Sequence, residues 1–143
     1  MHTRSDDIVA CAHTLIGVRF FHRGRDLRGI DCVGVPIYIA RELGIKTWDT
    51  VSYSQRPNVP EFMRLLRDSG STLVPFKEVA HGDMLRMMSS RQPVHIGIYE
   101  MTPSGQAYVI HAFQPFKKVV RSPLTPQEWQ KIQSVWRFPD VGS

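Results

Sequence analysis

The order of helix-like and strand-like segments is the feature that most constrains how this chain folds. In the first half, apolar residues recur at helical spacing, and glycines mark where the helices end. In the second half, short runs rich in β-branched and aromatic residues alternate with turn residues. Helices followed by an antiparallel sheet are typical of the α+β class. We therefore expect one domain over residues 1–143, with N-terminal helices packed on an antiparallel β-sheet.

The expected elements have definite bounds. The spacing predicts three helices, at residues 5–16, 32–43 and 61–69. Residues 18–31 and 47–60 have no clear periodicity and are expected to be loops. Strands are expected at residues 73–76, 83–88, 94–100, 107–113, 117–121 and 134–138, with a helical turn at 126–132.

Charge and composition exclude several classes of protein. The net charge of +5 is modest, and the basic residues are scattered without the aromatic spacing of a nucleic-acid module, so no nucleic acid is expected as a partner. The two cysteines form no disulfide framework. The sequence also lacks the CxxC and HExxH patterns that would predict a metal site. No apolar run reaches the ~20 residues of a membrane span, and acids interrupt the N-terminus where a signal peptide would be apolar. We expect synthesis in the cytoplasm without a signal peptide, and neither a metal nor an organic cofactor.

Cys32 is the first candidate for chemistry. In the stretch GIDCVGVP, at residues 29–36, the cysteine falls at the first turn of the predicted second helix. Backbone N–H groups and the helix dipole favour a thiolate there, so we expect a lowered pKa, and the same N–H groups can receive an oxyanion. Gly34 keeps the neighbourhood small enough for a substrate backbone to approach. The alternative is a buried cysteine that acts as a small hydrophobe, which is our interpretation of Cys11.

A nucleophilic cysteine needs a base and a group that orients the base. His95 and His111 both interrupt predicted strands. A hairpin centred on Pro103 would place the two directly opposite each other on one face, with Cβ atoms roughly 4.5–5.5 Å apart. Such a pair can serve as base and orienting group. The alternative is that each is a strand histidine whose ring is satisfied by a backbone partner.

These motifs, taken in order, resemble a known family. GIDCVGV, PVHIGIYE and VIHAF, together with HGDMLRM and the closing SVWRFP, resemble the NlpC-type family of papain-like cell-wall cysteine peptidases over most of the chain. Within that family the resemblance is closest to peptidases associated with phage tails and gene-transfer particles. It implies a papain-like fold.

The resemblance also implies roles for residues. Cys32 becomes the nucleophile, His95 the general base and later acid, and His111 the third residue that orients His95. Four residues line the site in this interpretation: Phe20, His22, Asp31 and Gly34. Phe20 stands where many family members carry tyrosine, and His22 offers a polar group nearby. Asp31 either satisfies local backbone N–H groups or receives a substrate amine.

The implied reaction is thiol-dependent hydrolysis of an amide bond in a peptidoglycan stem peptide. The implied setting is a virion tail that opens the bacterial cell wall during DNA entry, with phage-tail or gene-transfer-particle proteins as partners. Two alternatives stay open. The same site could transfer an acyl group to an amine or alcohol, or the chain could be a structural tail component with vestigial activity.

Overall fold

The computed structural model describes residues 4–47, 59–88 and 95–139. Within these residues the first half holds α1 (Arg4–Thr14), β1 (Arg25–Asp26), β2 (Gly29–Ile30), α2 (Gly34–Leu43) and α3 (Val59–Asp68). The second half holds β3 (Thr72–Val74), β4 (Met84–Met87), β5 (His95–Met101), β6 (Ala107–Phe113), β7 (Lys118–Pro123) and β8 (Ile132–Arg137). Three short helical segments lie between strands: η1 (Phe76–Glu78), η2 (Gln114–Phe116) and α4 (Pro126–Trp129).

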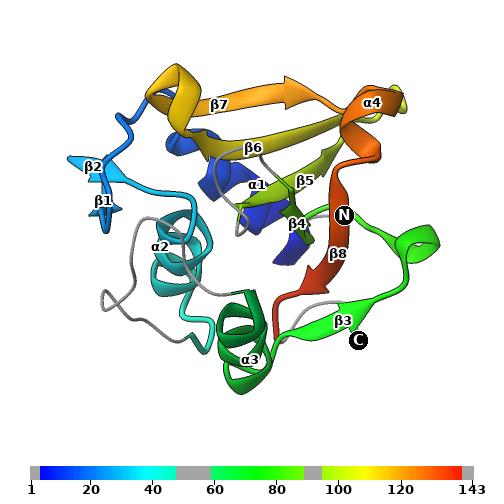
Figure 1. Ribbon diagram of the computed structural model, residues 1–143, viewed down its shortest axis with the longest axis horizontal. Coiled ribbons are helices and arrows are strands. Elements are labelled where there is room, and N and C mark those ends of the chain that lie inside the picture. The colour runs from blue at the N-terminus through cyan, green and yellow to red at the C-terminus, as the bar shows by residue number, and fades with distance from the viewer. Residues whose placement is uncertain (1–3, 48–58, 89–94, 140–143) are drawn as a thin grey trace.

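The six later strands form one antiparallel sheet in the order β3-β8-β4-β5-β6-β7 (Figure 1). Strands β4, β5, β6 and β7 follow one another in both sequence and space, as hairpin connections favour. Strand β8 returns to lie between β3 and β4. Strand β5, which carries His95, is therefore a central strand with neighbours on both sides.

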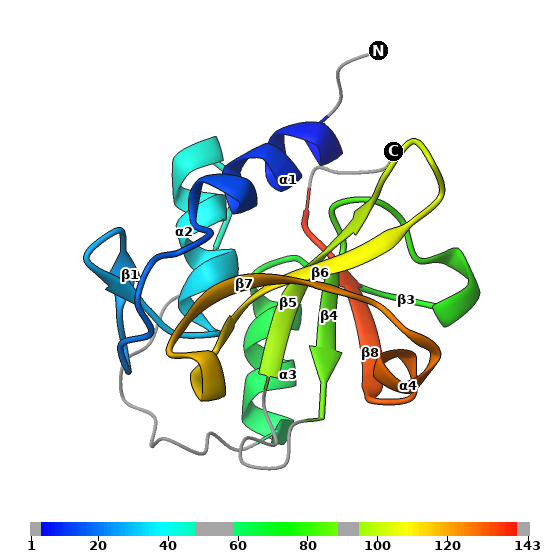
Figure 2. The same cartoon turned by 90° about the horizontal axis from the view of Figure 1, so that it is seen from above.

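The helices cover one face of this sheet. Helices α1 and α2 pack against each other and against β5 (Figure 2). Since side chains alternate along a strand, Ile96 and Ile98 join the helices in one buried cluster. Tyr99 points to the other face, where it packs in a second cluster with Val109. The sheet therefore has a helix-covered face and a second apolar face, and odd-numbered residues of β5 lie on the second.

The expected α+β class and antiparallel sheet are confirmed, and most bounds agree with the sequence. Helix α2 ends at Gly44, whose φ of 68° is the left-handed conformation that stops a helix. The expectation of a plain loop at residues 18–31 is wrong, because β1 and β2 pair there as a short hairpin. Residues 48–58 of the second expected loop, and residues 89–94, lie outside the described residues. In the part of the chain that the structure describes, no helix is long and apolar enough to cross a bilayer.

The β5–β6 hairpin has a different register from the one expected. Ile98 pairs with Ile110 and Met101 with Ala107, so the hairpin is centred on Ser104 and not on Pro103. Continuing this register places His111 opposite Gly97, two residues along from His95. The two histidines are therefore diagonal neighbours on one face, because the turn holds five residues, 102–106, closed by Thr102 and Gln106.

Gly97 is required by this diagonal arrangement. A Cβ built on it would lie 2.5 Å from Val109 Cγ2 and 2.9 Å from His111 Cβ. Real Cβ atoms do not approach other atoms so closely, so a side chain here would force β6 residues Val109 and His111 to shift. The absence of a side chain at position 97 lets the ring of His111 reach diagonally toward β5.

We predict that Gly97→Ala destabilises the protein by about 1–3 kcal/mol, the usual cost of overpacking a core. Denaturant unfolding measures the free energy, and histidine NMR signals report whether His111 has moved. Ser104→Ala, at the exposed tip of the same hairpin, is the control and should change stability by less than about 0.5 kcal/mol. An equal, small effect of both substitutions would contradict this account of Gly97.

Candidate active site

The first turn of α2 is held by a buried carboxylate. Asp31 is 2% exposed, and its Oδ1 accepts hydrogen bonds from the Gly34 N–H at 2.8 Å and from Arg25 Nη1 at 3.0 Å. Its Oδ2 accepts from the Arg23 N–H at 2.9 Å. The Val35 N–H donates to the Asp31 carbonyl, so the helical turn begins at Asp31 and includes Cys32. Cys32 therefore lies in the turn that leads into α2, whereas the helix itself begins at Gly34 and not at residue 32 as the sequence predicts.

These contacts agree with the first of the two roles expected for Asp31, which is to satisfy local backbone N–H groups. The backbone N–H groups of Gly34 and Arg23 and the side chain of Arg25 already use both carboxylate oxygens. The ion pair with Arg25 is itself nearly closed to solvent, with side chains 3% and 11% exposed. The carboxylate thus connects the β1–β2 hairpin to the start of α2, and its geometry supports the structural role over capture of a substrate amine.

Gly34 is buried against this same hairpin. A Cβ at position 34 would collide with the Gly24 carbonyl oxygen and would lie 2.8 Å from Ile30 Cγ1. The space beside its Cα is therefore filled by the chain itself. The structure explains the glycine by close packing of α2 on the hairpin, and not by the approach of a substrate backbone.

The Cys32 thiol is buried, and burial dominates its ionisation. The residue is 4% exposed and belongs to the helix-side core cluster. Burial, and next the negative charge of Asp31, raise the pKa of the thiol to about 12. Hydrogen bonds from the N–H groups of Ile96, Val33 and Cys32 lower it, but by less. The expectation of a lowered pKa is therefore wrong for this state, because loss of solvent outweighs the helix N-terminus.

The contact with Ile96 places Cys32 at a gap in the sheet. Among the described residues, pairing between β5 and β6 begins only at Ile98 and Ile110, whereas β4 pairs with β5 from His95 onward. The Ile96 N–H instead interacts with the Cys32 sulfur. The thiol therefore lies against the backbone of the residue that follows His95.

His95 and His111 form the direct contact that the sequence suggested. Nε2 of His95 lies 2.6 Å from Nδ1 of His111, and the rings meet edge to face with centroids 4.8 Å apart. Nδ1 of His95 has no hydrogen-bond partner and, among the described residues, is the one buried side-chain nitrogen or oxygen of this kind. His95 thus has one ring nitrogen in contact with His111 and one buried ring nitrogen without a hydrogen-bond partner.

Both imidazoles are held in the neutral form. Burial, and next the neighbouring His111, lower the pKa of His95 to about 3. Burial lowers the pKa of His111 to about 4. Since the Cys32 pKa is raised, the state described here holds a neutral thiol and neutral imidazoles, and not a thiolate–imidazolium pair.

A hydrogen bond that the sequence analysis missed extends this pair. Nε2 of His111 lies 3.1 Å from the hydroxyl of Ser122 on β7. Val109 pairs with Ser122, and His111 with Val120, so Ser122 is diagonal to His111 just as His95 is. Ser122 falls one residue beyond the strand predicted at residues 117–121, and its register relative to His111 depends on the short helical segment η2 between β6 and β7.

An open pocket of about 520 Å³ adjoins the two histidines. Ser122 lines it next to His95 and His111, Phe113 and Phe116 form an aromatic wall, and Cys32 does not contribute. Lys131 and Glu128 also line it and pair with each other at 3.1 Å. The volume is sufficient for part of a peptide, and its lining is apolar with a few polar groups, as in many small-molecule sites.

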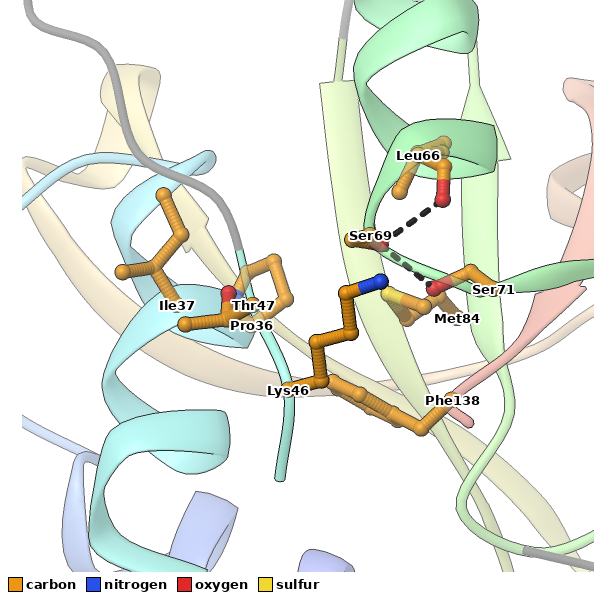
Figure 3. Close-up of a pocket in the computed structure, with 9 residues that line it drawn as sticks. All are labelled: Pro36, Ile37, Lys46, Thr47, Leu66, Ser69, Ser71, Met84 and Phe138. Carbon is orange, nitrogen blue, oxygen red and sulfur yellow. Dashed lines mark hydrogen bonds between the residues drawn. The ribbon is translucent and has the colours of Figure 1, made fainter. Parts of the chain in front are cut away.

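Two other hollows are less suited to this chemistry. One lies between α2 and α3, where Ser69 and Ser71 share a hydrogen bond (Figure 3). Its volume of about 10 Å³ corresponds to roughly one water molecule. The other, of about 430 Å³, lies on the arginine-rich β1–β2 hairpin, away from both histidines. Within the described residues no group of three or more His, Cys, Asp or Glu side chains is placed to hold a metal ion.

Phe20 and His22 lie on the segment that leads into this hairpin. Phe20 is half-buried and packs against the core cluster that contains Cys32, while its N–H donates to the Lys117 carbonyl. His22 is also half-buried and lies in a turn. Neither contributes to the pocket beside His95. Their roles as site-lining residues stay predictions.

Comparison with known proteins finds one family and several solved structures. The profile of the NlpC/P60 family matches residues 17–137. A search of curated proteins found no match. The NlpC/P60 domain of the peptidoglycan hydrolase SagA is 22% identical, with a TM-score of 0.63 over 94% of this chain and 98% of that one.

Two further structures share the fold at lower identity. An NlpC/P60 family protein from Bacillus cereus ATCC 10987 is 19% identical with a TM-score of 0.67; the match covers 96% of this chain and 41% of that one. An N-acetylmuramoyl-L-alanine amidase from Bacteroides uniformis ATCC 8492 is 11% identical, also with a TM-score of 0.67, over 95% and 99% of the two chains. At these identities the similarity establishes the fold, which is papain-like.

We predict that the free energy of unfolding falls as the pH drops below about 6.5, the unperturbed histidine value. The unfolded chain then binds protons that His95 and His111 cannot bind, because their pKa values in the folded state are about 3 and 4. Each buried histidine contributes a slope of up to about 1.4 kcal/mol per pH unit. Denaturant unfolding of His111→Asn between pH 7 and 4.5 should show a shallower slope than the wild type. His22→Asn is the control. If the slope for His111→Asn equals the slopes of the wild type and of this control, the prediction is refuted.

We predict that Cys32 alkylates slowly in the folded protein and that its rate still rises above pH 9. Its thiol is buried, with a pKa raised to about 12. Rates from mass spectrometry in iodoacetamide, with and without urea, provide the measurement. Urea should accelerate the reaction by exposing the thiol and restoring its usual pKa near ~8.5. A plateau in the rate below pH 8 in the folded protein would contradict the raised pKa.

Proposed function

Since the chain belongs to the NlpC/P60 family, we propose that it is a cysteine endopeptidase that hydrolyses amide bonds in peptidoglycan stem peptides. Members of this family are cysteine peptidases and amidases that act on peptidoglycan. The family match spans Cys32, His95 and His111. The chain is accordingly a cysteine peptidase of the cell-wall hydrolase class, and the cleavage of stem peptides is the finer proposal.

The observation that carries the proposal is the orientation of the His95 ring. His95 uses Nε2 to contact His111 and keeps the buried Nδ1 without a partner. The Cys32 sulfur interacts with the N–H of Ile96, the next residue along β5. A nucleophile beside a base, with the base oriented by a third group, is the arrangement that covalent catalysis requires.

The geometry supports a general-base mechanism. The Cys32 sulfur attacks the amide carbon while its proton passes to Nδ1 of His95, so charge separates only as the new bond forms. N–H groups at the first turn of α2 receive the oxyanion. His95 then returns the proton to the leaving amine, and a thioester remains on Cys32. Water attacks the thioester with His95 again as base, which releases the carboxylic acid and restores the thiol.

His111 acts as the third residue in this proposal. Its ring prevents His95 from rotating, and in the proposed tautomer its Nδ1 accepts a hydrogen bond from the Nε2–H of His95. That tautomer leaves Nδ1 of His95 as the acceptor for the thiol proton. The low pKa of His95, about 3 in the substrate-free state, keeps the ring uncharged at neutral pH, so that one of its two nitrogens carries no proton.

We also propose the biological setting that the sequence resemblance implied. The protein would act at the bacterial cell wall as part of a phage tail or gene-transfer particle, with particle proteins as docking partners. The support for this setting is the resemblance of the motifs around Cys32, His95 and His111 to those of tail-associated peptidases. Co-purification of the chain with assembled particles tests this setting separately from the enzymatic activity.

We predict that the purified protein releases new amino and carboxyl groups from isolated peptidoglycan, which mass spectrometry of the soluble fragments locates to one peptide bond. Cys32→Ser and His95→Ala should each lower the rate by at least about 10³-fold. Cys11→Ala removes the other thiol and should leave the rate within about twofold of the wild type, as expected outside the site.

The products separate this proposal from its alternatives. Fragments joined to an added amine or alcohol would identify an acyltransferase with the same site. Intact peptidoglycan after incubation with both the free protein and assembled particles would favour a structural component.

A further inference from the structure

The polar contacts on the second face of the sheet continue beyond the two histidines. His95, His111 and Ser122 occupy β5, β6 and β7, and each contacts the next across a diagonal. The distances are 2.6 Å between His95 Nε2 and His111 Nδ1, and 3.1 Å between His111 Nε2 and Ser122 Oγ. Both ring nitrogens of His111 are therefore used, one by each neighbour.

A chain of this kind carries its protons in one of two directions. In the first, His95 Nε2–H donates to His111, and His111 Nε2–H donates to the Ser122 oxygen. In the second, the Ser122 hydroxyl donates to His111 Nε2, His111 Nδ1–H donates to His95 Nε2, and His95 carries its proton on Nδ1. Only the first direction leaves Nδ1 of His95 as a base.

The proposed role of His95 as the base selects the first direction. In either direction the buried Nδ1 has no hydrogen-bond partner, but in the second direction it already carries a proton and cannot accept one from the thiol. The first direction instead needs an acceptor for His111 Nε2–H at the other end of the chain, and the Ser122 oxygen is in that position.

We propose that Ser122 is a positioning residue that accepts the His111 Nε2–H hydrogen bond and thereby keeps Nδ1 of His95 unprotonated. This proposal rests on the proposed peptidase function, because the base role of His95 selects the direction of the chain, whereas the tautomer can be measured without any activity. Ser122 acts through His111 and does not contact the reacting atoms. Its effect is on the fraction of molecules in which His95 can accept the thiol proton.

The first test is the tautomer of His95, read from ¹⁵N chemical shifts of histidine-labelled protein at neutral pH. The wild type should show His95 protonated on Nε2 and unprotonated on Nδ1. Ser122→Ala should increase the population with Nδ1 protonated, and Ser122→Thr, which keeps the hydroxyl, should restore the wild-type pattern. A wild-type protein with His95 Nδ1 protonated overturns the proposal, and that result needs no variant to fold and no activity.

The second test is the rate of peptidoglycan cleavage. Ser122→Ala should lower kcat about tenfold, the equivalent of one hydrogen bond, and leave KM unchanged. Ser122→Thr should stay within about threefold of the wild type by the same reasoning. Equal kcat for the wild type and Ser122→Ala, with the same His95 tautomer in both, overturns the proposal.

Ser134→Ala is the matched control for a purely structural hydroxyl. Ser134 accepts hydrogen bonds from Arg86 Nε and Trp136 Nε1 within the sheet, away from the histidines. Its removal should lower stability but leave kcat and the His95 tautomer unchanged. If Ser122→Ala behaves in the same way as Ser134→Ala, Ser122 is structural only and the positioning role is refuted. If the wild type cleaves nothing while the tautomers respond as expected, the peptidase proposal fails and the Ser122 contact stands.

Discussion

The buried carboxylate of Asp31 is the interaction on which the candidate site depends most. It joins three parts of the chain: the turn at Arg23, the hairpin side chain Arg25 and the N-terminus of α2 at Gly34. The hydrogen bonds and the buried ion pair with Arg25 compensate the loss of water around this carboxylate. Its position fixes the turn that carries Cys32 just before α2. The same negative charge opposes ionisation of Cys32, so the group that positions the nucleophile also keeps it protonated.

The sheet supplies the other half of the site by a different means. The histidines meet because Gly97 leaves space beside His111, and because the hairpin register places them on a diagonal. Positioning on adjacent central strands restricts side-chain motion more than positioning on loops would. Nucleophile and base thus come from separate elements, α2 and β5, which contact each other at Ile96. Their relative placement depends on the packing of α2 against β5 in the helix-side core.

Much of this arrangement was predictable from local sequence patterns. Helical periodicity, strand alternation and the placement of Cys32, His95 and His111 all carry local signals, and they predicted the class and the histidine pair. Three features were not predictable. The register of the hairpin depends on the turn at 102–106, the burial of Cys32 depends on packing between distant segments, and the β1–β2 hairpin has strands of only two residues. The burial of Cys32 and the pairing of β1 with β2 are decided by tertiary contacts, which a single sequence does not display, whereas the hairpin register changes with one residue in the length of the turn.

The contact between Cys32 and the Ile96 N–H means that the nucleophile is also part of the sheet's hydrogen-bonding scheme. Ile96 lies beyond the end of the β5–β6 pairing. Its N–H has the Cys32 sulfur as acceptor in place of a carbonyl oxygen of β6. Replacing Cys32 with alanine would remove this acceptor. The Ile96 N–H, next to His95 along the strand, would then lose its partner. A catalytically dead alanine variant of this protein is therefore also a perturbed strand, and it is a poor surrogate for the resting enzyme in substrate-binding studies. Serine, which keeps an acceptor at the same place, is the better inactive form.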